Sequence, residues 1–153
     1  MIVFRLSKSK YATDLSGRGT ETSGGRWNSK GVAMLYTSES RALCTTEIAV
    51  HAALGNLPND YSIIIIKIPD KASIKELAVS KLPPDWQSFP HSHSTQKLGD
   101  QFSADHEFLV LKVPSAVVDG DHNFLLNPNH KDFGKVSVIN IEPFTFDERL
   151  FAK

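Results

Sequence analysis

The sequence holds a single cysteine, Cys44, and this scarcity removes two kinds of architecture. One cysteine cannot form an intrachain disulfide, and it cannot build a thiolate metal centre. Long hydrophobic runs are also missing. The longest aliphatic run, Ile63 to Ile66, is far too short to cross a bilayer, and the first ten residues carry no signal-peptide pattern. We therefore expect a cytoplasmic protein without membrane contact.

Net charge is absent as well. Seventeen lysines and arginines balance seventeen aspartates and glutamates, so no strong electrostatic field would draw the chain onto nucleic acid or an anionic membrane. This balance counts against a nuclease and against direct nucleic-acid binding.

Common ligand motifs are missing too. Gly17 and Gly19 begin a GxG pattern, but Thr22 stands where the third glycine of a dinucleotide-binding loop belongs. No GxxxxGK[ST] phosphate loop and no HExxH zinc motif occurs. His91 and His93 lie close together, yet two histidines without clustered acids or cysteines are better interpreted as a solvated loop. The sequence thus predicts no metal and no prosthetic group.

What is present fits one domain spanning residues 1–153. With 41% hydrophobic and 22% charged residues, the chain is long enough for one real core and too short for two ordinary domains. Extended segments are expected at 2–6, 26–28, 32–36, 61–68, 107–113 and 136–141, and helices at 40–54 and 95–104. A polar loop over 7–24 and an irregular stretch over 81–90 separate them. This irregular order favours an α+β fold over a doubly wound one.

The segment from Gly24 to His51 is the most informative. On a helix that begins at Ser40, Glu47 and His51 stack on one face within an apolar stripe, so Glu47 points toward the protein. An unpaired buried carboxylate is costly. Glu47 is therefore either a satisfied core acid, bonded to His51 or a backbone amide, or a functional group.

Two further residues near Glu47 suggest a ligand. Arg26 follows Gly24 and Gly25, where the backbone can approach a ligand closely and a guanidinium can hold a phosphate or carboxylate with two hydrogen bonds. Tyr36 ends a short strand, and its ring could stack on a flat heterocycle while its hydroxyl stays wet. The alternatives are a surface cation and an ordinary strand aromatic.

Other polar positions are less distinctive. Ser115 follows Pro114 at the end of a strand, where it could contact a ligand or stabilise a turn. Arg5 alternates with apolar residues of the first strand and could face either a ligand or solvent. Asn123 and Asn127 are interpreted as turn-forming scaffold.

Five segments together resemble one protein family: GGRWNSKG, LYTSES, TTEIAVH, LKVPSAVV and NFLLNPNH. They closely resemble the RES domain, the toxin half of bacterial RES–Xre toxin–antitoxin pairs. The arginine, glutamate and serine that give this family its name fall on Arg26, Glu47 and Ser115, and the family's tyrosine falls on Tyr36. Ser29 replaces the usual proline after GGRWN, which changes loop stiffness more than chemistry.

The resemblance implies a fold similar to ADP-ribosyltransferases, with mixed sheets and few helices, and an enzyme that degrades NAD as its substrate. The implied catalytic residues are Glu47, Arg26 and Tyr36. Glu47 would stabilise the ribosyl cation, Arg26 would hold the pyrophosphate, Tyr36 would stack near the nicotinamide, and Ser115 would orient that end. Arg5 is a further substrate-binding candidate.

The resemblance leaves the acceptor of the ADP-ribosyl group open. Water or phosphate would give NAD loss, which the family favours, and a protein side chain would give mono-ADP-ribosylation. A non-catalytic nucleotide-binding module stays as the alternative from another class. The implied partner is an Xre-like helix-turn-helix antitoxin that contacts DNA itself and plugs the pocket, and paired copies of the chain are suggested as a homodimer.

Overall fold

The computed structural model describes residues 1–52 and 56–152. Within these ranges the strands are β1 (Ile2–Lys8), β2 (Leu35–Ser38), β3 (Tyr61–Lys67), β4 (Ile74–Glu76), β5 (Val110–Pro114), β6 (His122–Leu126) and β7 (Ser137–Phe144). The helices are α1 (Arg18–Ser23), α2 (Arg41–Ala49) and α3 (His93–Asp105). This irregular order of one mixed sheet and few helices confirms the expected α+β fold. No helix in the described ranges is long and apolar enough to cross a membrane.

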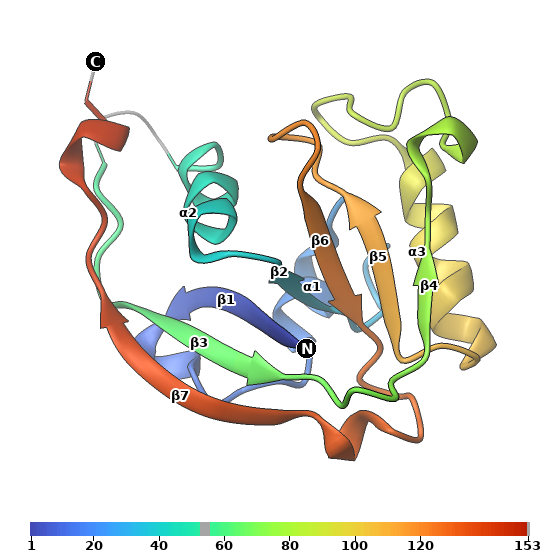
Figure 1. Ribbon diagram of the computed structural model, residues 1–153. Helices are drawn as coiled ribbons and strands as arrows, with labels where there is room; N and C mark the ends of the chain where they lie inside the picture. The colour runs from blue at the N-terminus through green and yellow to red at the C-terminus, as the bar shows by residue number, and fades with distance from the viewer. Residues whose placement is uncertain (53–55, 153) are drawn as a thin grey trace.

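The strands form one sheet in the order β4-β5-β6-β2-β1-β3-β7. Neighbouring strands are antiparallel apart from β4 and β5, which run parallel. Figure 1 shows that the sheet bends where β1 meets β2, so that β1, β3 and β7 form one half and β2, β6, β5 and β4 the other. The pair Phe4 and Ser38 joins the halves. Helix α2 lies beside this junction, and α3 lies beside β4 and β5 (Figure 1).

The main core contains residues from both halves of the sheet. Val3 and Ile64 come from one half, and Val110 and Leu126 come from the other. Strand β3 is buried on both faces, which explains its four consecutive isoleucines: Ile63 packs with Cys44 of α2, while Ile64 belongs to the main core. The sequence predicted this strand correctly.

Helix α2 begins as expected after Ser40, whose side-chain oxygen accepts a hydrogen bond from the Leu43 N–H at 3.0 Å. Its buried residues are Leu43 and Cys44. Burial raises the pKa of the Cys44 thiol to about 11, so this cysteine stays protonated at neutral pH. The helix ends at Ala49, earlier than predicted, and the predicted end at Leu54 lies outside the described residues.

Several predicted segments differ from the structure near the N-terminal half. The stretch 7–24 is not all loop, because it contains a 3₁₀ turn, Ser9–Tyr11, and helix α1. The predicted strand at 26–28 is a turn closed by a bridge between Gly25 and Asn28. Strand β2 begins at Leu35 and therefore lies further along the chain than predicted.

Three differences concern the C-terminal half. Strand β5 spans Val110–Pro114, whereas 107–113 was predicted. Strand β6 contains Asn123, which the sequence had assigned to a turn. Strand β7 continues through Pro143, although an end before this proline was predicted. β7 is the last strand of the sheet, so one of its two edges has no neighbouring strand to bond with. Proline, which has no N–H to donate, is found in edge strands of this kind. Because β7 is an edge strand, it can include a proline, and the predicted end before Pro143 was too early.

Helix α3 holds the segment around Arg26 in place. A Cβ atom at Gly99 would lie 1.5 Å from the carbonyl oxygen of Trp27, so only glycine allows this contact between backbones. The Gln96 amide donates to the carbonyl oxygens of Gly25 at 3.0 Å and Asn28 at 3.2 Å. The predicted helix at 95–104 is therefore real, and one of its faces positions the candidate site.

Candidate active site

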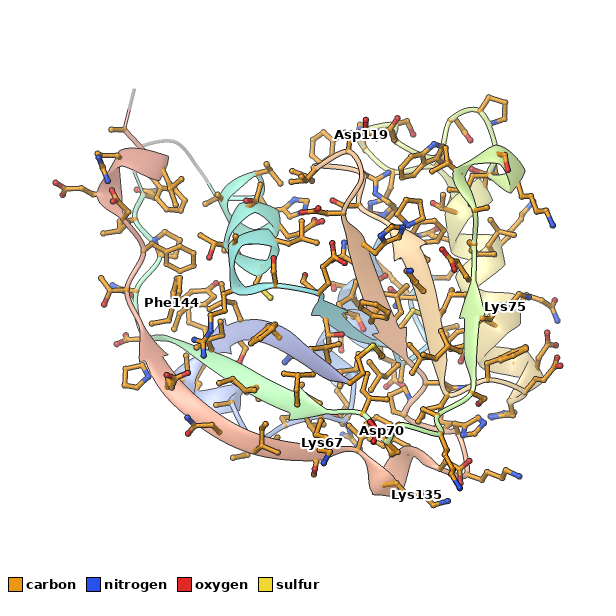
Figure 2. All side chains as sticks on the ribbon, in the orientation of Figure 1. Lys67, Asp70, Lys75, Asp119, Lys135 and Phe144 are labelled. Atoms are coloured by element: carbon orange, nitrogen blue, oxygen red, sulfur yellow. The ribbon has the colours of Figure 1, made fainter. Side chains whose placement is uncertain are left out.

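A cavity of about 630 Å³ opens between α2, the turn around Arg26, the loop that carries Gln87 to His91 and the connection between β5 and β6. Figure 2 shows Asp119 at the tip of the β5–β6 connection, which rises on the side of the molecule where α2 ends. The lining includes residues from each of these parts: Gly25, Arg26, Trp27, Tyr36, Glu47, Val50, His51, Gln87, Phe89, His91, Ala116, Val117 and Asn123. Arg26, Tyr36 and Glu47, which the sequence singled out, thus share one cavity. Its volume suits a ligand the size of a nucleotide.

Glu47 is held by side chains from two other parts of the chain. Its Oε1 accepts hydrogen bonds from Ser115 Oγ at 2.8 Å and from Asn123 Nδ2 at 2.8 Å. Asn123 is itself oriented by Ser38 Oγ, which donates to Asn123 Oδ1 at 2.7 Å. Among the described residues Oε2 has no hydrogen-bond partner. Glu47 is therefore neither bonded to His51 nor fully satisfied, and one oxygen remains available at the cavity.

Ser115 contacts Glu47 directly and is not positioned to contact a ligand. The residue is 2% exposed, and its hydroxyl accepts from the N–H groups of Val117 at 3.1 Å and Val118 at 3.0 Å while donating to Glu47. These bonds use the hydroxyl hydrogen and both lone pairs. Ser115 is absent from the cavity lining, so in this structure it positions Glu47 and does not reach the place expected for nicotinamide.

Asn123 is a site residue that the sequence interpretation missed. It lines the cavity and touches Glu47, although it was assigned to scaffold. The segment His122–Leu126 has two polar residues followed by three apolar ones and lacks the polar–apolar alternation of a strand, which hides the strand. Had the strand been recognised, its pairing with β2 would have placed Asn123 opposite Ser38.

Arg26 connects its turn to a segment about sixty positions later, residues 86–91, here called the wall segment. Its Nη1 donates to the carbonyl oxygens of Trp86 at 2.7 Å and Ser88 at 2.9 Å. Burial lowers the pKa of Arg26, and the charges of Glu47 and Tyr36 oppose this effect. Nη2 and Nε form no hydrogen bond within the described residues. Part of the guanidinium therefore anchors the wall, and part can still bind an anion.

Tyr36 fixes the turn around Arg26 through its hydroxyl. The oxygen accepts from the Trp27 N–H at 3.0 Å and donates to Asn28 Oδ1 at 2.6 Å. The hydroxyl is therefore bonded within the protein and not kept wet as expected, and its burial raises the Tyr36 pKa. A Cβ at Gly25 would lie 2.6 Å from this oxygen, which explains the glycine. The ring still lines the cavity.

Arg5 lies outside the cavity lining. Its Nη1 is buried without a hydrogen-bond partner in the described part of the chain. Burial lowers the pKa of Arg5, and the nearby charge of Asp14 opposes the shift. The structure therefore offers no support for Arg5 as a ligand-binding residue of this cavity.

Aromatic residues of the wall segment complete the cavity. Phe89 lies beside His51, which follows the end of α2, with ring centroids 6.3 Å apart, and His91 lines the same cavity. Burial and the positive charges of Arg26, His51 and His93 lower the pKa of His91. In the described residues no cluster of three or more His, Cys, Asp or Glu could hold a metal ion. The sequence foresaw only irregular structure here, because nothing local connects the wall segment to Arg26.

The fold and the cavity define a class: an α+β protein with a nucleotide-sized cavity built around a positioned carboxylate and a half-buried arginine. The particular family follows from comparison. The RES domain model matches residues 2–147, and the chain belongs to the RES domain family.

Its relatives are toxins. The chain is 35% identical over 144 residues to the Prs ADP-ribosylating toxin of Sphingobium sp. (strain YBL2), covering 93% of this chain and 89% of that protein. It is 35% identical over 152 residues to Toxin Res of Photorhabdus laumondii subsp. laumondii, covering 98% and 97%. A chain in the crystal structure of the M. tuberculosis MbcT–MbcA toxin–antitoxin complex matches with a TM-score of 0.74. That match covers 94% of this chain and 84% of the other at 19% identity, which shows a shared fold.

Proposed function

We propose that this protein is a toxin that cleaves the nicotinamide–ribose bond of NAD and thereby depletes it. The observation that carries the proposal is the geometry of Glu47, whose Oε1 is fixed by Ser115 and Asn123 while Oε2 is left for a ligand in a cavity that Arg26 also lines. A carboxylate held in this way is prepared to stabilise positive charge without first having to reorganise.

The chemistry asks for such a group. When the bond between nicotinamide and C1′ of the ribose breaks, the electron pair leaves with the nicotinamide nitrogen, and the sugar becomes an oxocarbenium-like cation. Nicotinamide departs neutral from a cationic state, so little acid catalysis is needed. Glu47 stabilises the sugar cation, and the free nitrogens of Arg26 bind the diphosphate. NAD is the substrate, and no prosthetic group is required.

The acceptor distinguishes two versions of this reaction. Capture of the ribosyl cation by water or phosphate gives NAD hydrolysis or phosphorolysis. Capture by a protein side chain gives mono-ADP-ribosylation, and the name of the Sphingobium relative, an ADP-ribosylating toxin, favours this second candidate. The same donor site serves both, because the bond that breaks is the same.

An activity that depletes NAD would harm the cell that makes this protein, so it has to be inhibited. A chain that consumes NAD needs an inhibitor, and the structural neighbour was solved as a toxin–antitoxin complex. We infer an Xre-like antitoxin with a helix-turn-helix domain that covers the cavity and supplies the DNA contact, in an assembly that includes paired copies of this chain.

The test is to incubate purified protein with NAD and quantify nicotinamide, ADP-ribose and ADP-ribose 1-phosphate by chromatography, with and without phosphate. Glu47→Gln is the matched variant, because its amide oxygen can still accept from Ser115 and Asn123. We expect the wild type to release nicotinamide and the variant to be slower by about 10²- to 10³-fold.

Equal rates of nicotinamide release in the two proteins would contradict the role of Glu47. A folded wild type that binds NAD without consuming it would favour the non-catalytic binding module. If radiolabelled NAD instead marks a protein in a cell extract, and the mark depends on Glu47, the transferase version holds.

A further inference from the structure

Phe89 is the most exposed of the large hydrophobic side chains described, at 78% of its surface. The wall segment that carries Phe89 is anchored to the rest of the protein. Trp86 is buried at 8% exposure, and the carbonyl oxygens of Trp86 and Ser88 accept hydrogen bonds from Arg26. The phenyl ring is therefore held at the cavity while most of its surface faces water, which is unfavourable for an aromatic ring without a partner.

A second ring stands opposite. The His51 and Phe89 ring centroids are 6.3 Å apart with a tilt of 43°, and both residues line the cavity. Exposed apolar side chains flank the pair, with Val50 53% and Val117 37% exposed. A flat ring stacked between two others needs roughly 7 Å between their planes, twice the ordinary carbon contact distance. A small opening of the pair would admit one.

We propose that Phe89 and His51 form the subsite for the nicotinamide ring of NAD. The inference rests on the proposed function and adds to it the residues that recognise the leaving group. In this assignment Phe89 and His51 contact the nicotinamide ring, while Tyr36, whose hydroxyl is bonded to Trp27 and Asn28, positions the turn that carries Arg26.

The position of Glu47 decides which end of the dinucleotide binds here. His51 lies four residues after Glu47, just past the end of α2, and both side chains line the same cavity. The bond to be broken must lie at Glu47, and nicotinamide is attached to that bond directly. Adenine is separated from it by two riboses and the diphosphate, which would extend toward Arg26.

The charge of the ligand agrees with this assignment. Nicotinamide carries a positive charge while bound in NAD and none after release, and the face of a phenyl ring attracts a cation within about 6 Å of its centre. Phe89 would therefore favour the oxidised dinucleotide over the neutral product and over reduced NAD. This difference helps the product to leave.

The test measures affinity in the Glu47→Gln background, where NAD should be consumed about 10²- to 10³-fold more slowly, by calorimetry with NAD, reduced NAD and ADP-ribose. Phe89→Leu keeps an apolar side chain but removes the ring. We expect it to weaken NAD binding by about 3- to 30-fold and to leave ADP-ribose, which lacks nicotinamide, unchanged. The preference for NAD over reduced NAD should shrink by the same factor.

Ile139→Ala is the control, because Ile139 is also exposed, at 52%, and lies on β7 outside the cavity lining. It should change none of the three affinities. Since Phe89 is largely exposed, its variant should fold, which the thermal midpoint verifies.

Two results would overturn the assignment while the proposed function survives. Unchanged NAD affinity in Phe89→Leu would show that the ring does not contact the ligand. Equal weakening of NAD and ADP-ribose would place another part of the dinucleotide against Phe89. If the wild type neither binds NAD nor releases nicotinamide, the proposed function itself fails.

Discussion

The Tyr36 hydroxyl joins strand β2 to the turn that carries Arg26. It accepts from the Trp27 N–H and donates to the Asn28 side chain, which is itself completely buried and donates to the carbonyl oxygens of Thr20 and Val32. The position of Arg26 therefore depends on a short chain of hydrogen bonds within its own turn.

Replacing Tyr36 with Phe tests this role. The ring that lines the cavity is kept, but the Trp27 N–H and the Asn28 oxygen lose their partner, which costs about 1–3 kcal/mol for each buried group left unsatisfied. We expect a lower urea midpoint and a higher KM for NAD. Tyr11→Phe serves as the control, because Tyr11 is 52% exposed and lies outside the cavity lining. If the two variants behave alike, the ring alone defines the function of Tyr36.

The sequence could identify several candidate site residues, but not the residues that contact them in the folded chain. Arg26, Tyr36 and Glu47 were found because a glycine-flanked turn, a strand end and a helix face are local patterns. Phe89 and Asn123 were missed, because their places at the cavity depend on a hydrogen bond to Arg26 across the chain and on the pairing of β6 with β2. Ser115 was nominated for ligand contact, whereas its hydroxyl is occupied by Glu47 and two backbone amides.

Among the elements, α3 contacts the backbone of the turn around Arg26 directly. Gly99 lets the helix meet the Trp27 carbonyl, and Gln96 bonds to the carbonyls on either side of Arg26 and Trp27. The helix thus acts as a template for the turn that precedes β2.

Replacing either of two helical glycines with alanine should change the stability of the protein, but in opposite directions. Gly99→Ala should destabilise by about 1–3 kcal/mol or more, because its methyl group has no room beside Trp27. A Cβ atom at Gly19 of α1 would meet nothing within 4 Å, so Gly19→Ala should stabilise by up to about 1 kcal/mol through reduced unfolded-state entropy. Urea titration of both variants gives the signs. A stable Gly99→Ala protein would mean that α3 can move away from the turn.

Elements with strong local patterns were predicted well. The β-branched run of β3 and the capped start of α2 correspond to strand and helix as expected. Helix α1 was missed, because its sequence RGTETS is polar, carries a glycine, and lacks an apolar stripe. Strand β4 was missed as well, since its three residues are exposed and owe their conformation to parallel pairing with β5.

At the scale of the whole molecule, the neutral charge balance bears on partners. Seventeen cationic and seventeen acidic side chains leave little attraction for a polyanion. Any tight DNA binding by the toxin–antitoxin assembly should therefore come from the antitoxin.

We accordingly predict that the purified chain binds duplex DNA weakly, whereas its complex with the antitoxin binds DNA tightly and releases no nicotinamide from NAD. Both quantities should be measured on the same samples, with and without antitoxin, across a salt series. Tight, salt-sensitive DNA binding by the lone chain would contradict this division of labour, and so would full activity in the saturated complex.

The partners of Glu47 also set an order of events during synthesis. Ser115 and Asn123 lie 68 and 76 positions after the glutamate, so the donors that hold its carboxylate do not yet exist when α2 has been translated. A nascent chain must extend through β6, and close the sheet around it, before Glu47 is held in place. The carboxylate is therefore fixed only late in synthesis, so the proposed activity would begin only once most of the chain has been made.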